Sequence, residues 1–328
     1  MAKDSGKIQA VIQQQEMKEE DENCEIVILS MLSCNLLFMK EFRILKAYFN
    51  NMKETLKHHF TYIGYIGNSN EDFYDDETRI LHLSCPDDVN HTFEKTQKAL
   101  FFVNEHFSKY RFVFRTNTST VVNLRLLDRF IDTDIKPYNI YTSEIYRNDS
   151  IDNLKLSGLK PCMYYYLFDL YGRGNGLLLS EKIISEAILR ADCRGYSVDD
   201  YSIGCIMNMY WRRNGMSAFK SLVQIPHAWA ESMKKGFRSR FGNLWCKWGN
   251  DDYSFDFLKR FITVQVKAYD EKSRNDKEIG RMEKIIKVFQ NGNDKEIKKT
   301  VSFIHNDYEI FNTIFINIDK GYVNLNKI

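Results

Sequence analysis

The sequence lacks the features that point most directly to several common functions. Its 46 lysines and arginines nearly balance its 44 aspartates and glutamates, giving a net charge of +2, so nothing overall favours binding to nucleic acid. No apolar run approaches the roughly 20 residues that a membrane-spanning helix needs. The seven cysteines are scattered singly, without the spacing of a zinc site or a redox motif, and no internal repeat is present.

Two features of the sequence indicate the cellular compartment of the protein: its first 23 residues and its cysteines. Residues 1–23 are polar and rich in glutamine, glutamate and lysine, unlike a secretory signal, and we expect them to form a flexible segment. An odd number of isolated cysteines is explained most simply by free thiols in a reducing compartment. We therefore expect a cytoplasmic protein without a transmembrane segment, either free or in peripheral contact with the inner face of the membrane.

The first half of the chain alternates between two patterns. Apolar runs typical of buried parallel strands are separated by segments with helical spacing. We expect strands at 25–33, 60–67, 79–84 and 111–115, and helices at 36–58 and 92–107. This alternation predicts an α/β protein with a Rossmann-type, mostly parallel central sheet flanked by helices.

The second half is less regular. A glycine-rich turn at 170–176 leads into a short apolar run. Beyond it we expect helices at 181–191, 198–212 and 276–290 and a strand at 261–267, whereas 301–318 mixes both signals.

A polar turn after a buried strand is the clearest candidate site. Segment 112–124 reads as a strand, a turn and a second apolar run, and Asn117, Thr118 and Ser119 form the turn. Ligands of such sheets bind beyond the carboxyl ends of the strands, where Ser33 after the first strand is also expected. None of these side chains is acidic.

Two adjacent carboxylates, Asp199 and Asp200, stand at an expected helix start. They could do no more than cap backbone N–H groups there, which from the pair alone is the more common role. Their position after a glycine-rich turn and an apolar run also suits a general base facing the strand ends.

Two further features could contact a sugar. The turn around Gly174 and Asn175 lacks the full dinucleotide-binding spacing, but its glycines would allow either positive φ or close approach of the backbone to a sugar. Trp245 and Trp248 could form a platform for an acceptor, although at least one of them is expected in the core.

Three blocks, taken in order, resemble the β-1,3-galactosyltransferase and fringe-like glycosyltransferase families. Residues 87–96 resemble a family segment that begins with Asp and ends in Lys-Thr. Residues 115–124 resemble a strand and turn that normally reads Lys-Thr-Asp-Asp-Asp and ends in Val-Asn-Leu. Residues 172–180 with 199–204 are similar to the glycine turn and later acidic motif of the acceptor half. The resemblance covers about residues 25–215.

The resemblance implies a GT-A fold and an inverting hexosyltransferase-like enzyme of bacterial or viral type. It implies a nucleotide-diphospho-sugar donor, most simply a UDP-sugar, and a glycan or lipid-linked acceptor in polysaccharide or glycolipid synthesis. It places the general base on Asp200, with Asp199 as the alternate. The donor-binding residues that it implies are Ser33, Asp87, Lys95, Arg115, Asn117, Thr118 and Ser119.

The sequence departs from these families at the turn that normally binds Mn²⁺ or Mg²⁺. Asparagine, threonine and serine are poor substitutes for carboxylates on a hard cation. Either the enzyme works without a tightly held metal, or its donor differs, or the protein is an inactive sugar- or nucleotide-binding relative. Without a metal, Lys267 and Arg274, which flank a polar loop, could stabilise the diphosphate, although such basic residues are usually only solvated.

These expectations divide the chain into four parts. The flexible segment at 1–23 precedes a nucleotide-sugar-binding half at 24–135 and an acceptor-binding, catalytic half at 136–260. A strand–helix extension at 261–328 has no strong family match.

Overall fold

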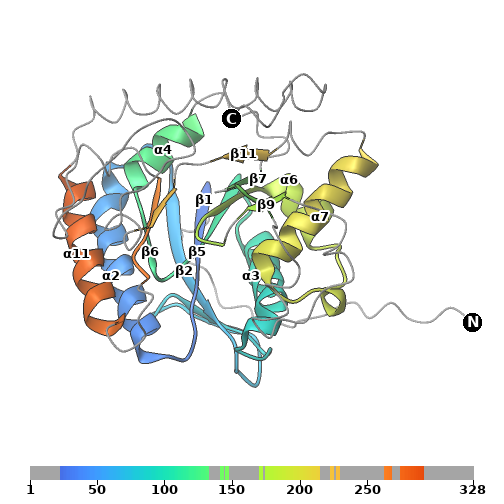
Figure 1. Ribbon diagram of the computed structural model, residues 1–328, viewed down its shortest axis with the longest axis horizontal. Helices are drawn as coiled ribbons and strands as arrows, with labels where there is room; N and C mark the ends of the chain where they lie inside the picture. Colours follow the sequence, from blue (N-terminus) through green and yellow to red (C-terminus); the bar gives the residue numbers. More distant parts are fainter. Residues whose placement is uncertain are drawn as a thin grey trace, which may run out of the picture.

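The computed structural model describes residues 23–132, 141–143, 145–147, 170–172, 174–214, 222–224, 227–229, 262–267 and 274–291. These residues build three layers, with helices on both sides of a central sheet (Figure 1). Helices α2 (Leu36–Met52) and α11 (Arg274–Gln290) cover one face, and α3 (Thr92–His106) and α7 (Asp199–Arg213) cover the other. The expected α/β class is confirmed.

The described strands of the main sheet follow the order β11-β7-β10-β5-β1-β2-β4-β3. β4, β2, β1 and β5 run parallel to one another, whereas β10 lies antiparallel between β5 and β7, and β3 is an antiparallel edge strand. The strands span Ile26–Met31 (β1), Phe60–Ile66 (β2), Phe73–Asp75 (β3), Ile80–His82 (β4), Phe112–Asn117 (β5), Tyr141–Ser143 (β7), Leu177–Ser180 (β10) and Leu222–Gln224 (β11).

Two smaller sheets complete the described strands. β12, β13 and β6 form one of them, and β8 pairs with β9 in the other. The strands span Thr120–Val122 (β6), Ile145–Arg147 (β8), Leu170–Gly172 (β9), His227–Trp229 (β12) and Thr263–Gln265 (β13). β13 pairs antiparallel with β6, and the Val266 N–H donates to the Ser119 carbonyl at 2.8 Å. The late strand is therefore fixed beside the turn that follows β5.

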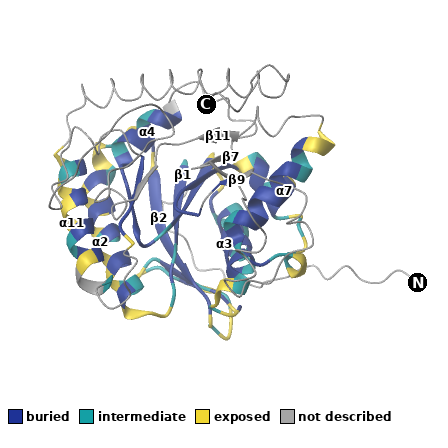
Figure 2. Cartoon of the chain, viewed as in Figure 1, coloured by how far each residue is buried: buried dark blue, intermediate teal, exposed yellow. Residues whose placement is uncertain are grey.

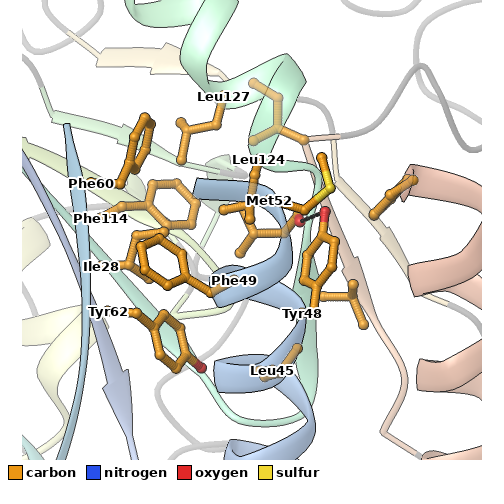
Figure 3. Packing of buried hydrophobic residues seen from close by; sticks show 14 of the residues in the cluster. Ile28, Leu45, Tyr48, Phe49, Met52, Phe60, Tyr62, Phe114, Leu124 and Leu127 are labelled. Atoms are coloured by element: carbon orange, nitrogen blue, oxygen red, sulfur yellow. Dashed lines mark hydrogen bonds between the residues drawn. The ribbon is translucent and has the colours of Figure 1, made fainter. Parts of the chain in front are cut away.

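The sheet face under α2 and α11 carries an aromatic core. The Tyr62 ring stacks between Phe42 and Phe49, with centroid distances of 5.4 and 5.7 Å. Tyr48 packs nearby and donates its hydroxyl to the Val122 carbonyl at 3.2 Å (Figure 3). Burying side chains of this size contributes about 1.5–3 kcal/mol each, so this face supplies much of the stability that holds α2 in place.

The opposite face of the sheet is equally buried. Val113 of β5 packs there with α3 and α7 side chains, including Phe93 and the fully buried Trp211. Figure 2 shows most of both helices as buried and the C-terminal end of α7 as exposed. Alternate residues of a strand face opposite sides, so Arg115 lies on the same face as Val113. Among the described residues, no helix combines the length and apolar character needed to cross a membrane.

Two helices end earlier than the sequence predicts. The expected extension of α2 to residue 58 is wrong, because the Thr55 hydroxyl bonds the Met52 carbonyl at 2.7 Å and the chain turns. Asp128 then accepts the backbone N–H groups of Lys57 and His58, which leads the chain into β2. The helix expected at 181–191 is α only over Glu181–Ile183 (α6), continues as a π-turn at Ile184–Ile188, and ends there.

Several short elements were not predicted. Helix α4 (Leu124–Asp132) follows β6 directly, with the Asn123 side chain accepting the Leu126 N–H at 3.2 Å as a local cap. Edge strand β3 was also missed because three residues are too few for a periodic signal. Short 3-10 segments occupy Lys53–Thr55, Val89–His91 and Cys193–Gly195. Residues 301–318 lie outside the described part of the chain.

Candidate functional site

The carboxyl ends of three parallel strands meet at one edge of the sheet. In the observed register, Met31 of β1 lies beside Tyr65 of β2 and beside Asn117 of β5. The loops after these strands therefore begin at the same level, as the sequence predicts. The candidate site is built around this edge.

Arg115 is the centre of a buried polar cluster at this edge. Its side chain is 1% exposed, and its Nη2 lies 2.5 Å from Asp199 Oδ2. Nε donates to the Tyr65 hydroxyl at 3.2 Å, and Nη1 donates to the Gly174 carbonyl. Every nitrogen of the guanidinium thus has a partner inside the protein.

A chain of hydroxyl groups closes this cluster. Thr96 Oγ1 donates to Asp199 Oδ2 at 3.0 Å and lies 3.0 Å from the Tyr65 hydroxyl. Because the Thr96 proton goes to Asp199, Tyr65 donates to Thr96 while accepting from Arg115. Asp199 also donates its backbone N–H to Thr92 Oγ1 at 3.2 Å, which joins the start of α7 to the start of α3.

The two adjacent aspartates have different environments. Asp199 is buried and its carboxylate is used by Arg115 and Thr96. Asp200 as a residue is only partly buried, and its carboxylate accepts the Gly174 N–H at 3.0 Å and the Tyr201 N–H at 2.7 Å. The sequence leaves both as candidates for a base. Among the described residues, Asp199 has an ion-pair partner and Asp200 has none.

The pKa of Asp200 is shifted towards neutrality. Desolvation and the neighbouring Asp199 carboxylate raise the pKa of Asp200 to about 6, although Arg115 and the two backbone N–H groups oppose the shift. A carboxyl group with a pKa near 6 is ionised at neutral pH and is a stronger base than an ordinary aspartate.

Gly174 is required at this site by space. A Cβ atom there would lie 2.5 Å from Arg115 Nη1 and 3.4 Å from Asp200 Oδ2. Next to it, Asn175 is buried, and its carbonyl accepts the Thr116 hydroxyl at 3.2 Å. The acceptor contacts expected of Gly174 and Asn175 stay predictions.

Asp87 and Lys95 are brought together as a buried ion pair. Asp87 Oδ1 lies 2.5 Å from Lys95 Nζ, and these side chains are 2% and 3% exposed. Lys95 also donates to the Leu32 carbonyl at 2.9 Å, and Asp87 Oδ2 accepts the Cys34 N–H at 2.9 Å. The pair ties the loop around Ser33 to α3, and donor contacts of these three residues stay predictions.

The turn at Asn117, Thr118 and Ser119 does not fit a divalent cation. Thr118 and Ser119 are buried, and the Thr118 hydroxyl donates to Glu41 Oε2 at 2.8 Å rather than facing an open site. Within the described ranges, no three His, Cys, Asp or Glu side chains converge in a way that could hold a metal ion.

Glu41 belongs to a second buried cluster, which the sequence reasoning missed. It lies on α2 beside Glu278 of α11, whose Oε1 accepts Arg274 Nε at 2.6 Å. Desolvation and the hydrogen-bonding Glu278 carboxyl raise the pKa of Glu41 to about 8. The sequence does indicate that Glu41 is buried, because it lies four residues from both Leu37 and Leu45 on one side of α2, and both leucines are buried.

The remaining predicted residues are placed as follows. Lys267 is exposed after β13. Arg274 bonds Glu278 and stacks over the Phe38 ring at 5.2 Å, so part of its guanidinium is used within the protein. Donor contacts for these two basic residues stay predictions, and Trp245 and Trp248 lie outside the described residues.

Comparison with known proteins gives structural likeness only. No protein-family model and no curated protein sequence matches the chain. Similar solved structures include galactosyltransferase LgtC in complex with donor and acceptor sugar analogues, at a TM-score of 0.44 and 10% identity, covering 84% of this chain and 99% of that one.

Two further solved structures are also glycosyltransferases. One is a glycosyltransferase involved in glycosylation of the major capsid of PBCV-1 (TM-score 0.40, 8% identity, 80% of this chain and 98% of that one). The other is the WbbM bifunctional glycosyltransferase (TM-score 0.39, 13% identity, 88% of this chain and 53% of that one).

Proposed function

We propose that the protein is an inverting glycosyltransferase that moves a sugar from a nucleotide-diphospho-sugar to a glycan or glycolipid acceptor. The observation that carries the proposal is the Asp200 carboxylate. It stands at the start of α7, close to the carboxyl ends of the parallel strands. No described lysine, arginine or histidine forms an ion pair with it, and its pKa is raised to about 6.

Asp200 acts as the general base in this proposal. It takes the proton of the acceptor hydroxyl as that oxygen attacks the anomeric carbon and the nucleoside diphosphate leaves. Its two backbone donors hold it at a helix start, where the helix dipole favours the ionised form. A UDP-sugar is the donor that we propose to test first, following the family resemblance.

Exchange of Asp200 for asparagine tests this role. In Asp200→Asn the loss of the base should slow transfer by about 10²-fold or more, with nucleotide binding and folding nearly intact. UDP release from a panel of UDP-sugars measures turnover, and fluorescence titration with UDP measures binding. Asp192→Asn is a matched control, because Asp192 lies on the surface before α7 and its side chain bonds Arg194 alone among the described residues. Wild-type turnover in Asp200→Asn would remove the assignment.

A second candidate is a catalytically inactive protein that binds a sugar or nucleotide. The turn after β5 favours it, because Thr118 is directed to Glu41 and no carboxylate is present between Asn117 and Ser119. This candidate predicts UDP binding without turnover on any donor, in wild type and in Asp200→Asn alike.

A further inference from the structure

The Arg115 cluster and Asp200 meet at one residue, Gly174. Its carbonyl accepts from Arg115 Nη1, and its N–H donates to Asp200 Oδ2 at 3.0 Å. Arg115 therefore fixes one side of a glycine whose other side holds the Asp200 carboxylate. Only a glycine fits between them, because the guanidinium occupies the space that a Cβ atom would need.

We propose that Arg115 is a positioning residue for Asp200, acting through Gly174 while it neutralises the adjacent Asp199. The catalytic meaning of this positioning rests on the proposed function of Asp200. The contacts themselves do not depend on that function, so they can be tested separately.

The Arg115 guanidinium is held in place firmly enough to fix the position of Gly174. It is bound at Nε by Tyr65 and at Nη2 by Asp199, and both partners are buried. Tyr65 and Asp199 are in turn joined through Thr96. The guanidinium thus links β2, α3 and the start of α7, and the Gly174 carbonyl accepts a hydrogen bond from it.

Arg115 also sets the charge next to Asp200, because it forms its ion pair with Asp199. The positive charge of Arg115 lies next to Asp199 and partly offsets the repulsion between the Asp199 and Asp200 carboxylates. Without it, two uncompensated carboxylates would lie on neighbouring residues, and the protonated form of Asp200 would be favoured. Orientation and charge are therefore two separable effects of one side chain.

Nuclear magnetic resonance can measure both effects in one titration. Protein labelled with carbon-13 at the aspartate carboxyls and nitrogen-15 at the amides is titrated with acid, and the Asp200 signal is assigned by its loss in Asp200→Asn. In wild type, the Asp200 carboxyl and the Gly174 and Tyr201 amides should change together, with a midpoint of about 6.

In Arg115→Met the midpoint of Asp200 should rise by about one pH unit or more. The Gly174 amide should no longer follow the titration, because its bond to Asp200 depends on the Arg115 contact. The Tyr201 amide should still follow, since its bond to the preceding carboxylate is local. Arg111→Met, at an exposed arginine near the start of the same strand, is the matched control and should leave all three signals unchanged.

Two other variants keep the test decisive if Arg115→Met does not fold. Arg115→Met combined with Asp199→Asn removes both members of the buried ion pair, so the Gly174 amide should no longer follow the Asp200 titration. Gly174→Ala keeps both charges but displaces the guanidinium, so the coupling should be lost with a smaller change in midpoint.

Coupling of Gly174 to Asp200 that persists in the folded Arg115 and Gly174 variants would overturn the positioning role. That result is distinct from failure of the proposed function. If Asp200→Asn retains full transfer, the base assignment fails even where Gly174 and Asp200 are coupled through Arg115.

Discussion

Two clusters on opposite faces of the sheet contain the same charged groups in different surroundings. Asp199, Asp200 and Arg115 lie on the α3 and α7 face, and a second set of two glutamates and one arginine lies on the α2 and α11 face. Each set carries one negative charge in excess when fully ionised. They differ in what offsets that charge.

Backbone donors offset the charge in the first cluster. Asp200 receives two backbone N–H groups and its pKa of about 6 leaves it ionised at neutral pH. In the second, Glu41 Oε2 receives only the Thr118 hydroxyl, and Oε1 meets no donor among the described residues. With a pKa of about 8, Glu41 keeps a proton at neutral pH and shares it with Glu278. The same composition thus gives a base on one face and, once Glu41 is protonated, a set with no net charge on the other.

Removal of the buried arginine should have the largest effect on stability. Arg115→Met leaves Asp199 as a buried, uncompensated charge, which typically costs about 3–5 kcal/mol. Urea unfolding measures the loss. The double variant with Asp199→Asn should recover a large part of it, and equal stability of the two variants would show that the ion pair is not what Arg115 contributes.

The second cluster should respond to pH in the opposite direction from an ordinary carboxylate. The pKa of Glu41 rises from 4.5 to about 8 on folding, so the folded state binds the extra proton. The free energy of unfolding should therefore fall as pH rises from about 4.5 to 8, by an amount on the order of a few kcal/mol.

Glu41→Gln should flatten this pH dependence, because an amide can donate to Glu278 without a titrating proton while still accepting from Thr118. Thermal melting from pH 5 to pH 9 checks it. Glu283→Gln, at an exposed glutamate of α11, is the matched control and should keep the wild-type profile. A flat profile in wild type would contradict the shared proton.

The single hydroxyl that serves the second cluster should matter less. Thr118→Val removes the donor to Glu41 and should lower the free energy of unfolding by about 1–3 kcal/mol, with the pKa of Glu41 raised further. Urea unfolding at pH 6 and pH 9 should show a larger loss at the higher pH. A loss that is the same at both pH values would separate Thr118 from the charge of Glu41.

Chelation should have the smallest effect. The turn at 117–119 offers no carboxylate, and its Thr118 hydroxyl is already bonded, so EDTA should leave most of any transfer activity in place. Complete loss with EDTA and recovery with Mn²⁺ would show that other residues hold a metal.

The sequence predicted the layers better than it predicted the site. The alternating patterns located β1, β2, β5 and α3 to within a few residues, because buried parallel strands and an amphipathic helix follow from local periodicity. The antiparallel direction of β10 could not be predicted, since it depends on a neighbour, β5, that is distant in sequence.

Within the site, the start of α7 at Asp199 was predictable from local signals, but the different roles of the two aspartates were not. What separates them is Arg115, which arrives from β5 and binds Asp199 rather than Asp200. Glu41 was overlooked although helical spacing places it on the buried side of α2. A carboxylate on an apolar stripe is a signal that sequence reading can use.

A structure of the protein with bound UDP tests the account most directly. We predict that the diphosphate binds at the carboxyl ends of β1, β2 and β5, on the α3 and α7 side of the sheet where Asp200 lies, with the Arg115–Gly174 contact intact. UDP bound on the α2 and α11 side of the sheet, or away from this edge altogether, would contradict the proposed site.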